Sequence, residues 1–371
     1  MTSKERVLRA INHQEVDRIP LDLGGMACSL QDEIYFKLKD ALGFPGDIEP
    51  FREGSTCCYY DERLLDYFEI DIRRIFAKST GKFPIHFPDG SFQNEWGLVQ
   101  KKGKFGIDFV RSPLEDAEIE DLESYPWPKA EDIFDLTGMR EKAEALHAEN
   151  QYAISLRAPV NGIFELACWM RGTENFMVDM LADEEFAHAL TDKILEVQMD
   201  WYGHILDEVG PYVDMVETGD DYGAQNSLLI SPECLEEFIL SKRKRLNTMI
   251  KEKAPQAKIF LHCCGSIKRI IPAIAASGVD VLNPVQTAAT DMDPYDLKAA
   301  YGDLICFHGG VDTQKALRGT KEDVEKEVRR MLEAMNHNGG YILSSCNHIQ
   351  GDVPVENIIT LFECAKKLSQ K

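Results

Sequence analysis

The sequence lacks the long apolar run that a membrane-spanning helix needs. None of its apolar stretches reaches the roughly 18 residues required to cross a bilayer. Residues 1–6 (MTSKER) also lack the apolar core of a signal peptide. Both absences predict a cytoplasmic protein with no membrane partner. In that compartment the ten cysteines are expected to be thiols or metal ligands rather than disulfides.

Positive charge is also in short supply. The chain has 41 Lys and Arg residues against 63 Asp and Glu residues, which gives a formal net charge of −22. A surface this acidic repels phosphate groups, so nucleic acid and anionic membranes are not expected as partners. The sequence therefore favours small molecules or other proteins as partners.

Short apolar segments alternate with amphipathic helical patterns along most of the 371 residues, without repeats or low-complexity tracts. Expected strands are 18–23, 70–76, 153–158, 213–218, 258–261, 279–284, 304–308 and 340–344. Expected helices are 184–208, 232–253, 268–277, 321–336 and 355–368, with Ser231 and Thr320 as N-caps. Eight strands that alternate with helices predict an α/β fold, a closed (β/α)8 barrel of the TIM type.

One stretch between residues 77 and 130 departs from this alternation. Pro84, Pro88 and the pair Asp89-Gly90 are turn signals, and residues 91–109 have the pattern of β-hairpins. The run 125–128 (YPWP) is expected to be an extended connector. We interpret the stretch as a β-rich insertion beside the barrel, within a single domain that spans 1–371.

Polar residues fall at the ends of the expected strands, where the active sites of such barrels lie. The candidates for substrate binding are Asp220, Arg157, Gln286, His308, Asn347 and His348. Two alternatives stay open, because His308 would also serve as a structural histidine and the pair Asp220-Asp221 as a turn cap. Loops are polar in any protein, so these positions alone do not define a site.

The segment Leu261-His262-Cys263-Cys264-Gly265 carries the clearest chemical signal. Side chains two apart at a strand end point to the same side, so His262 and Cys264 face the barrel interior and Cys263 faces the helices. Imidazole and thiolate together suit zinc, and a catalytic zinc site keeps one position open. The predicted catalytic residues are His262, Cys264 and Glu217.

A third metal ligand must come from elsewhere in the chain. Cys346 is the best candidate by position, although a lone buried cysteine is more often a small core residue. The fifth and eighth strands are not neighbours, so Cys346 has to lean inward to reach His262. Glu217, on the neighbouring fourth strand, is expected either to bind the metal or to hold His262. The predicted metal ligands are therefore His262, Cys264, Cys346 and Glu217.

Several motifs spread over the chain resemble the uroporphyrinogen decarboxylase superfamily. The matching segments are 6–10 (RVLRA), 17–20 (DRIP), 219–223 (GDDYG), 231–233 (SPE), 262–266 (HCCGS), 282–286 (LNPVQ), 307–312 (FHGGVD) and 349–357 (IQGDVPVEN). Together they are specific for that superfamily, and the resemblance implies a (β/α)8 barrel.

The resemblance implies one of two chemistries. The decarboxylases bind porphyrinogen carboxylates through an arginine-rich N-terminal segment and use no metal, but residues 20–26 (PLDLGGM) contain no arginine. The zinc-dependent methyltransferases of corrinoid systems carry a His-x-Cys pair and a later Cys, as this chain does. In a simple alignment that later Cys falls near Asn347, one position beyond Cys346. Without a one-residue bulge, Glu217 or His348 would take its place.

The resemblance to the methyltransferase branch implies Zn²⁺ as a cofactor and a corrinoid (cobalamin) carried by a partner protein. The expected reaction moves a methyl group from a small-molecule donor to the cobalt of that corrinoid protein. A methoxylated aromatic is the expected donor, so the reaction would be an O-demethylation. The alternative is metal-independent decarboxylation of a porphyrinogen. Base rates for soluble enzymes favour a homodimer.

Overall fold

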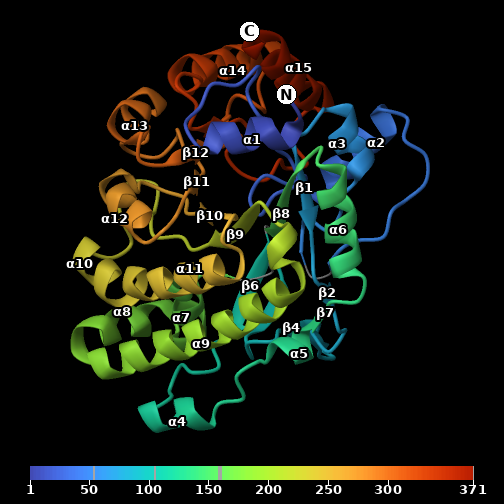
Figure 1. The fold of residues 1–371 in the computed structure, drawn as a ribbon. Helices are drawn as coiled ribbons and strands as arrows, with labels where there is room; N and C mark the ends of the chain where they lie inside the picture. The colour runs from blue at the N-terminus through green and yellow to red at the C-terminus, as the bar shows by residue number, and fades with distance from the viewer. Residues whose placement is uncertain (53–54, 104–105, 158–160, 371) are drawn as a thin grey trace.

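Seven parallel strands form the central sheet. The computed structural model describes residues 1–52, 55–103, 106–157 and 161–370 (Figure 1). The order of the strands in the sheet is β1-β8-β9-β10-β11-β12-β13, and every neighbouring pair is parallel. Their bounds are β1 (Ile72–Ile75), β8 (Ala153–Arg157), β9 (Met215–Gly219), β10 (Lys258–His262), β11 (Val281–Asn283), β12 (Cys306–His308) and β13 (Tyr341–Ile342).

A short segment around Leu21 completes the barrel between β13 and β1. Leu21 forms a parallel bridge with Leu343, just after β13. On the other side, the backbone N–H of Asp71, just before β1, donates a hydrogen bond to the Leu21 carbonyl. The expected strand at 18–23 is thus reduced to a bridge, in keeping with Pro20, which has no N–H to donate to a ladder. The other seven expected strands are confirmed within two or three residues, except that Ala158 lies outside the described residues.

A small apolar core fills the inside of the barrel. Each of the seven strands contributes one inward side chain, and α1 (Ser3–Ile11) contributes two from the end of the barrel where the strands begin. These residues are Val7, Ile11, Ile72, Ala153, Met215, Phe260, Val281, Cys306 and Ile342. Because side chains alternate along a strand, the residues two further along also point inward, toward the carboxyl ends of the strands.

Helices surround the sheet (Figure 1). They are α2 (Asp32–Ala41), α3 (Glu62–Tyr67), α4 (Ile119–Ser124), α5 (Ala130–Ile133), α6 (Met139–Glu149), α7 (Ile163–Arg171), α8 (Thr173–Ala182), α9 (Glu184–Val209), α10 (Pro232–Cys234), α11 (Ser241–Lys253), α12 (Ile271–Ala276), α13 (Pro294–Tyr301), α14 (Lys321–Met335) and α15 (Val355–Ser369), with the 3-10 turns η1 (Gly210–Tyr212) and η3 (Lys268–Ile270). The expected helix at 232–253 contains a π-helical segment, η2 (Leu235–Leu240), between α10 and α11. The side chains of Ser231 and Thr320 cap α10 and α14, as predicted. None of the described helices combines the length and hydropathy of a membrane span.

The β-rich insertion is a small antiparallel sheet beside the barrel. Its strands are β3 (Ile85–His86), β4 (Ser91–Gln93), β5 (Val99–Lys102) and β6 (Ile107–Arg111), paired in sequence order. A separate two-stranded pair joins β2 (Lys78–Ser79) to β7 (Phe134–Asp135). The sheet therefore lies within the predicted interval of 77–130.

Candidate functional site

Asp221, His262 and Cys264 bring their ligand atoms together at the carboxyl end of β10. The carboxylate, imidazole and thiol atoms all lie within 4.8 Å of one another. The Asp221 carboxylate accepts hydrogen bonds from the Cys264 backbone N–H at 2.8 Å and from the Cys264 thiol at 3.0 Å. His262 Nε2 lies 3.6 Å from Asp221 Oδ1, and the side chains of His262 and Asp221 are 15% and 30% exposed. We call these three residues the ligand group.

The chemistry of the ligand group fits a divalent cation. Burial and the neighbouring Asp221 carboxylate raise the pKa of the Cys264 thiol well above its usual range. Glu165, on α7, adds to this acidic environment, and burial together with Asp221 and Asp220 raises its own pKa. A bound dication would reverse these shifts and hold a thiolate. A nitrogen, sulfur and oxygen donor set is typical of zinc sites.

Two glycine loops bring Asp221 to the ligand group. In the parallel ladder Gly219 of β9 lies opposite His262 of β10, and the Asp220 N–H extends that pairing to the His262 carbonyl. Gly265 has φ +93°, and a Cβ added to it would lie 2.4 Å from the Gly223 backbone. The loops after β9 and β10 therefore approach as closely as they do because both positions are glycine.

A chain of buried hydrogen bonds runs from His262 into the barrel. His262 Nδ1 lies 2.6 Å from Asn283 Oδ1, and Asn283 Nδ2 lies 2.9 Å from His308 Nδ1. His308 Nε2 in turn lies 2.8 Å from Asp22 Oδ2. Asn283, His308 and Asp22 are fully buried. We call Asp22, His308 and Asn283 the relay residues.

The relay residues determine which nitrogen of His262 carries the proton. Burial alone would raise the pKa of Asp22, but Arg74 and His308 outweigh burial and hold that pKa well below its usual range. An ionised Asp22 only accepts, so His308 carries its proton on Nε2, and its Nδ1 accepts from the Asn283 amide. The Asn283 oxygen then faces His262 and accepts from Nδ1–H. The Nε2 lone pair of His262 is left free on the side of Asp221.

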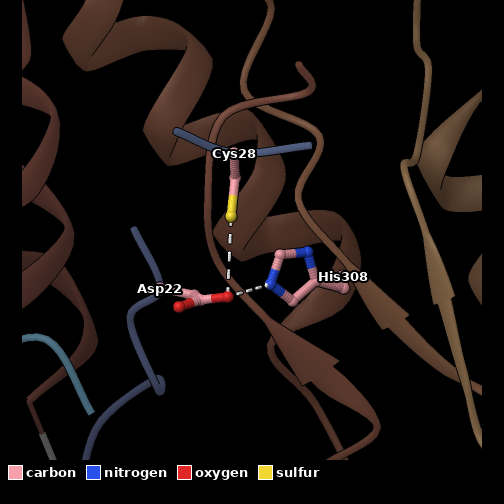
Figure 2. Close-up of side chains that lie close together, drawn as sticks. All are labelled: Asp22, Cys28 and His308. Carbon is pink, nitrogen blue, oxygen red and sulfur yellow. Dashed lines mark hydrogen bonds and ion pairs between the residues drawn. The ribbon is translucent and has the colours of Figure 1, made fainter. Parts of the chain in front are cut away.

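A second group of possible ligands, Asp22, Cys28 and His308, lies deeper in the barrel. Figure 2 shows the Cys28 sulfur and the His308 ring both directed at the same Asp22 oxygen, with the sulfur 3.6 Å away. Arg74 holds the same carboxylate through two hydrogen bonds of 2.7 and 2.6 Å. The guanidinium already supplies the positive charge that a metal would bring, and burial raises the pKa of Cys28 so that it stays a thiol. This group is therefore part of a hydrogen-bonded ion-pair network and does not fit a metal.

Glu217 belongs to the same buried network. Its Oε1 accepts from Arg74 Nε at 2.7 Å and from the Ser155 hydroxyl at 2.9 Å, while Oε2 accepts from the Met26 N–H at 2.8 Å. Both oxygens are thus occupied in a layer below the ligand group. Arg74 and the relay residues link Glu217 to His262, and the predicted roles of Glu217 in metal binding and catalysis stay predictions. Sequence reasoning missed Arg74, although its inward position two residues after Ile72 was a usable signal.

Comparisons with known proteins place this barrel in a family. Residues 97–368 match the model of the uroporphyrinogen decarboxylase (URO-D) family. The chain belongs to the URO-D family. Among its curated relatives, a uroporphyrinogen decarboxylase from Geobacter metallireducens is 25% identical over 279 residues, covering 71% of this chain and 76% of the relative. One from Legionella pneumophila (strain Corby) is 23% identical over 369 residues, covering 98% and 96%.

A solved structure shares the fold of this URO-D family member over nearly its whole length. It is a methyltransferase from Methanosarcina mazei, with a TM-score of 0.67, 16% sequence identity and 99% coverage of both chains. The expected resemblance and the barrel fold are thereby confirmed.

Two of the remaining predicted site residues of this URO-D barrel make hydrogen bonds that hold loops in place. Asp220 is fully buried, accepts from the backbone N–H groups of Phe164 and Glu165 at the start of α7, and pairs with Arg243. The Gln286 side chain accepts from the Gly265 N–H at 2.7 Å. Both residues hold the loops that carry the ligand group, and binding of substrate by either stays a prediction.

The loop after β13 carries the last three predicted residues. Cys346 is 8% exposed and its N–H donates to the Val311 carbonyl, but it belongs to neither of the two ligand-atom groups among the described residues. Asn347 is exposed and its side chain accepts from the N–H of His348. His348 Nδ1 accepts from the Ser29 N–H at 3.0 Å. Metal binding by Cys346 and substrate binding by Asn347 and His348 stay predictions.

Proposed function

We propose that this protein is a zinc-dependent methyltransferase. It moves a methyl group from a methoxylated aromatic to the cobalt of a corrinoid carried by a partner protein. The observation that carries this proposal is the ligand group, in which the relay residues leave the lone pair of His262 Nε2 free beside a carboxylate and a thiol. The proposed ligands are His262, Cys264 and Asp221, with Cys346 as a further candidate.

The reaction breaks the bond between the methyl carbon and the ether oxygen and forms a bond from that carbon to reduced cobalt. The oxygen keeps the electron pair and afterwards takes up a proton. His262, Cys264 and Asp221 would hold the zinc, which would supply a Lewis acid for that oxygen. Cys264 gives up its thiol proton when it becomes a ligand, and Asn283 holds the Nδ1–H of His262 so that the imidazole keeps its orientation.

Metal-independent decarboxylation of a porphyrinogen is the second candidate. The names of the curated relatives favour it. Two features disfavour it: residues 20–26 contribute no arginine, and their one carboxylate, Asp22, is occupied by Arg74. A cytoplasmic location and a homodimer are part of our proposal for either activity.

Two measurements separate the candidates. Metal analysis of the purified full-length protein should find about one zinc per chain, and much less in Cys264→Ser. Zinc-loaded protein mixed with free cob(I)alamin and 4-methoxybenzoate should form methylcobalamin, followed by its absorption spectrum. Absence of zinc in the intact protein refutes the methyltransferase proposal. Release of carbon dioxide from uroporphyrinogen I by metal-free protein would establish the second candidate instead.

A further inference from the structure

Arg157, at the end of β8, is a buried cation that forms no ion pair with a carboxylate of the described residues. Six arginines are buried among the described residues, and five of them form ion pairs with carboxylates: Arg6, Arg18, Arg73, Arg74 and Arg243. Arg157 is 5% exposed and forms none within the described part of the chain. Its Nη1 donates to the Gly24 carbonyl at 3.0 Å and to the Ser29 hydroxyl at 3.1 Å. Its Nε and Nη2 have no acceptor among the described residues.

Burial of a charged group without a partner is costly, because water no longer solvates the charge. Among the buried arginines of the described residues, Arg157 alone has no carboxylate partner, and it is therefore the one that can bind an added anion. The free Nε and Nη2 edge of a guanidinium is the planar pair of donors that matches the two oxygens of a carboxylate.

A second unpaired cation lies beside Arg157. Arg52 donates to the Cys57 carbonyl at 2.9 Å and has no carboxylate partner among the described residues. The guanidinium carbons of Arg52 and Arg157 lie 5.2 and 5.3 Å from the centroid of the same Phe51 ring. Burial and the charge of Arg52 lower the pKa of Arg157 to about 10. The two like charges repel each other, and the nearby Glu217 carboxylate offsets the charge of Arg157 only in part.

His348 completes the cluster. Its Nδ1 accepts from the Ser29 N–H, so the neutral ring carries its proton on Nε2 and offers a donor there. Ser29 links the two residues, because its hydroxyl binds Arg157 and its N–H binds His348. Arg157 ends β8 and His262 ends β10, on either side of β9 in the parallel sheet, so the cluster lies at the same barrel mouth as the ligand group.

We propose that Arg157, Arg52 and His348 bind a carboxylate group of the small substrate. This inference rests on the proposed function in one respect: it takes the ligand group as the place where the ether of the substrate reacts. The substrate class is then a methoxylated aromatic acid, with its carboxylate on the guanidinium of Arg157 and its ether oxygen toward His262 and Cys264. A protein with a net charge of −22 repels acids as a whole, so recognition of an acid depends on this local cluster.

Calorimetric binding of 4-methoxybenzoate and 4-methoxybenzamide to the full-length protein tests the inference. The two probes share the ring and the methoxy group and differ in charge. We expect the acid to bind at least about tenfold more tightly than the amide, as one charge-assisted pair allows. In Arg157→Gln the acid should lose at least about tenfold in affinity and the amide should change little. Equal affinities for the two probes, no binding of the acid, or an unchanged preference in Arg157→Gln overturns the inference.

Arg73→Gln is the matched control. Arg73 is also buried and lies on β1, but it pairs with Asp66 at 2.5 Å and donates to the Ile70 carbonyl. Its replacement should lower the melting temperature and leave the acid preference intact, whereas Arg157→Gln should not lower the melting temperature. The same titration with Cys264→Ser separates this inference from the proposed function. Preference for the acid that persists in Cys264→Ser, without any formation of methylcobalamin by the wild type, refutes the methyltransferase and leaves the carboxylate site standing.

Discussion

Asn283→Leu cuts the hydrogen-bonded chain between His262 and His308 and should weaken zinc binding. The wild-type Asn283 side chain is fully buried, with its oxygen 2.6 Å from His262 Nδ1 and its nitrogen 2.9 Å from His308 Nδ1. Loss of an outer partner of a ligating histidine costs about 10-fold to 100-fold in metal affinity, or about 1.4 to 2.7 kcal/mol. Leucine has the same number of side-chain heavy atoms and the same branching at Cγ, and its methyl groups are bulkier than the amide, so the substitution removes the hydrogen bonds without leaving a cavity.

The same substitution has a separate cost in stability. It leaves His308 Nδ1 buried without a partner, which should lower the free energy of unfolding by about 1 to 3 kcal/mol. His262 is partly exposed, so its Nδ1 can turn to water and adds less. The two effects are measured independently, the first by zinc titration against a chromophoric chelator and the second by urea unfolding of metal-free protein.

Two further variants sharpen the test. Asn283→Asp keeps an acceptor for His262 Nδ1–H but removes the donor to His308, so it should lose stability and retain most of the zinc affinity. Asn247→Leu replaces another buried asparagine, on α11, whose amide binds the Ser277 carbonyl and not the site. It should leave zinc affinity unchanged. If Asn283→Leu folds and binds zinc as tightly as the wild type, the relay residues do not orient His262 for a metal.

Three other outcomes follow from the structure. Asp221→Ala should lower zinc affinity by more than the roughly tenfold expected for an outer partner, measured by the same zinc titration. Cys346→Ser should lower zinc affinity less than Asp221→Ala does. The reverse order would make Cys346 the third ligand. Arg74→Met leaves two buried carboxylates unpaired and should cost about 3 to 5 kcal/mol in urea unfolding; a loss below about 1 kcal/mol would contradict the role given to this network. The folded-state pKa of His348 is about 3, below its unfolded value of about 6.5. The unfolded state therefore binds more protons between these pH values, so the contribution of His348 is complete above about pH 6.5 and is lost as the pH falls toward 3. Unfolding of the wild type and His348→Gln at several pH values should show a shallower acid decline in the variant, and parallel curves would contradict the reasoning.

Local patterns predicted the barrel and the position of its mouth, because strand alternation and helix caps depend on neighbouring residues. The inward direction of His262 is one example: Phe260, two residues earlier, lies in the inner core, while Cys263 packs in the outer one. The first strand was expected to be longer than the single bridge at Leu21. Its pairing depends on Leu343 and Asp71, which are far away in the sequence and cannot be read from the segment itself.

The partners of the site residues could not be predicted, because they depend on register between strands. Asp221 comes beside Cys264 because Gly219 lies opposite His262 in the ladder, and one sequence does not reveal which residues face each other. Asn283 belongs to the motif 282–286 (LNPVQ), but its two histidine partners come from β10 and β12. Arg74 escaped notice because it lies inside a strand with four buried residues, where charge is not expected.

The charged residues inside the barrel differ in whether they form ion pairs. We infer that the ion-paired residues support the structure of the site and that Arg157 recognises the substrate. Asp22, Arg74 and Glu217 form a layer with no exposed side-chain surface, in which the single guanidinium of Arg74 forms an ion pair with each of the two carboxylates. Such a layer is rigid, because release of any one group would leave the other charges buried and unpaired. Through His308 and Asn283 that rigidity reaches His262. Arg157, at the end of β8, forms no ion pair within the described part of the chain, so a bound carboxylate would stabilise its charge. In our proposal the ion-paired layer therefore holds the reacting end of the site in place, and Arg157 selects the carboxylate that enters it.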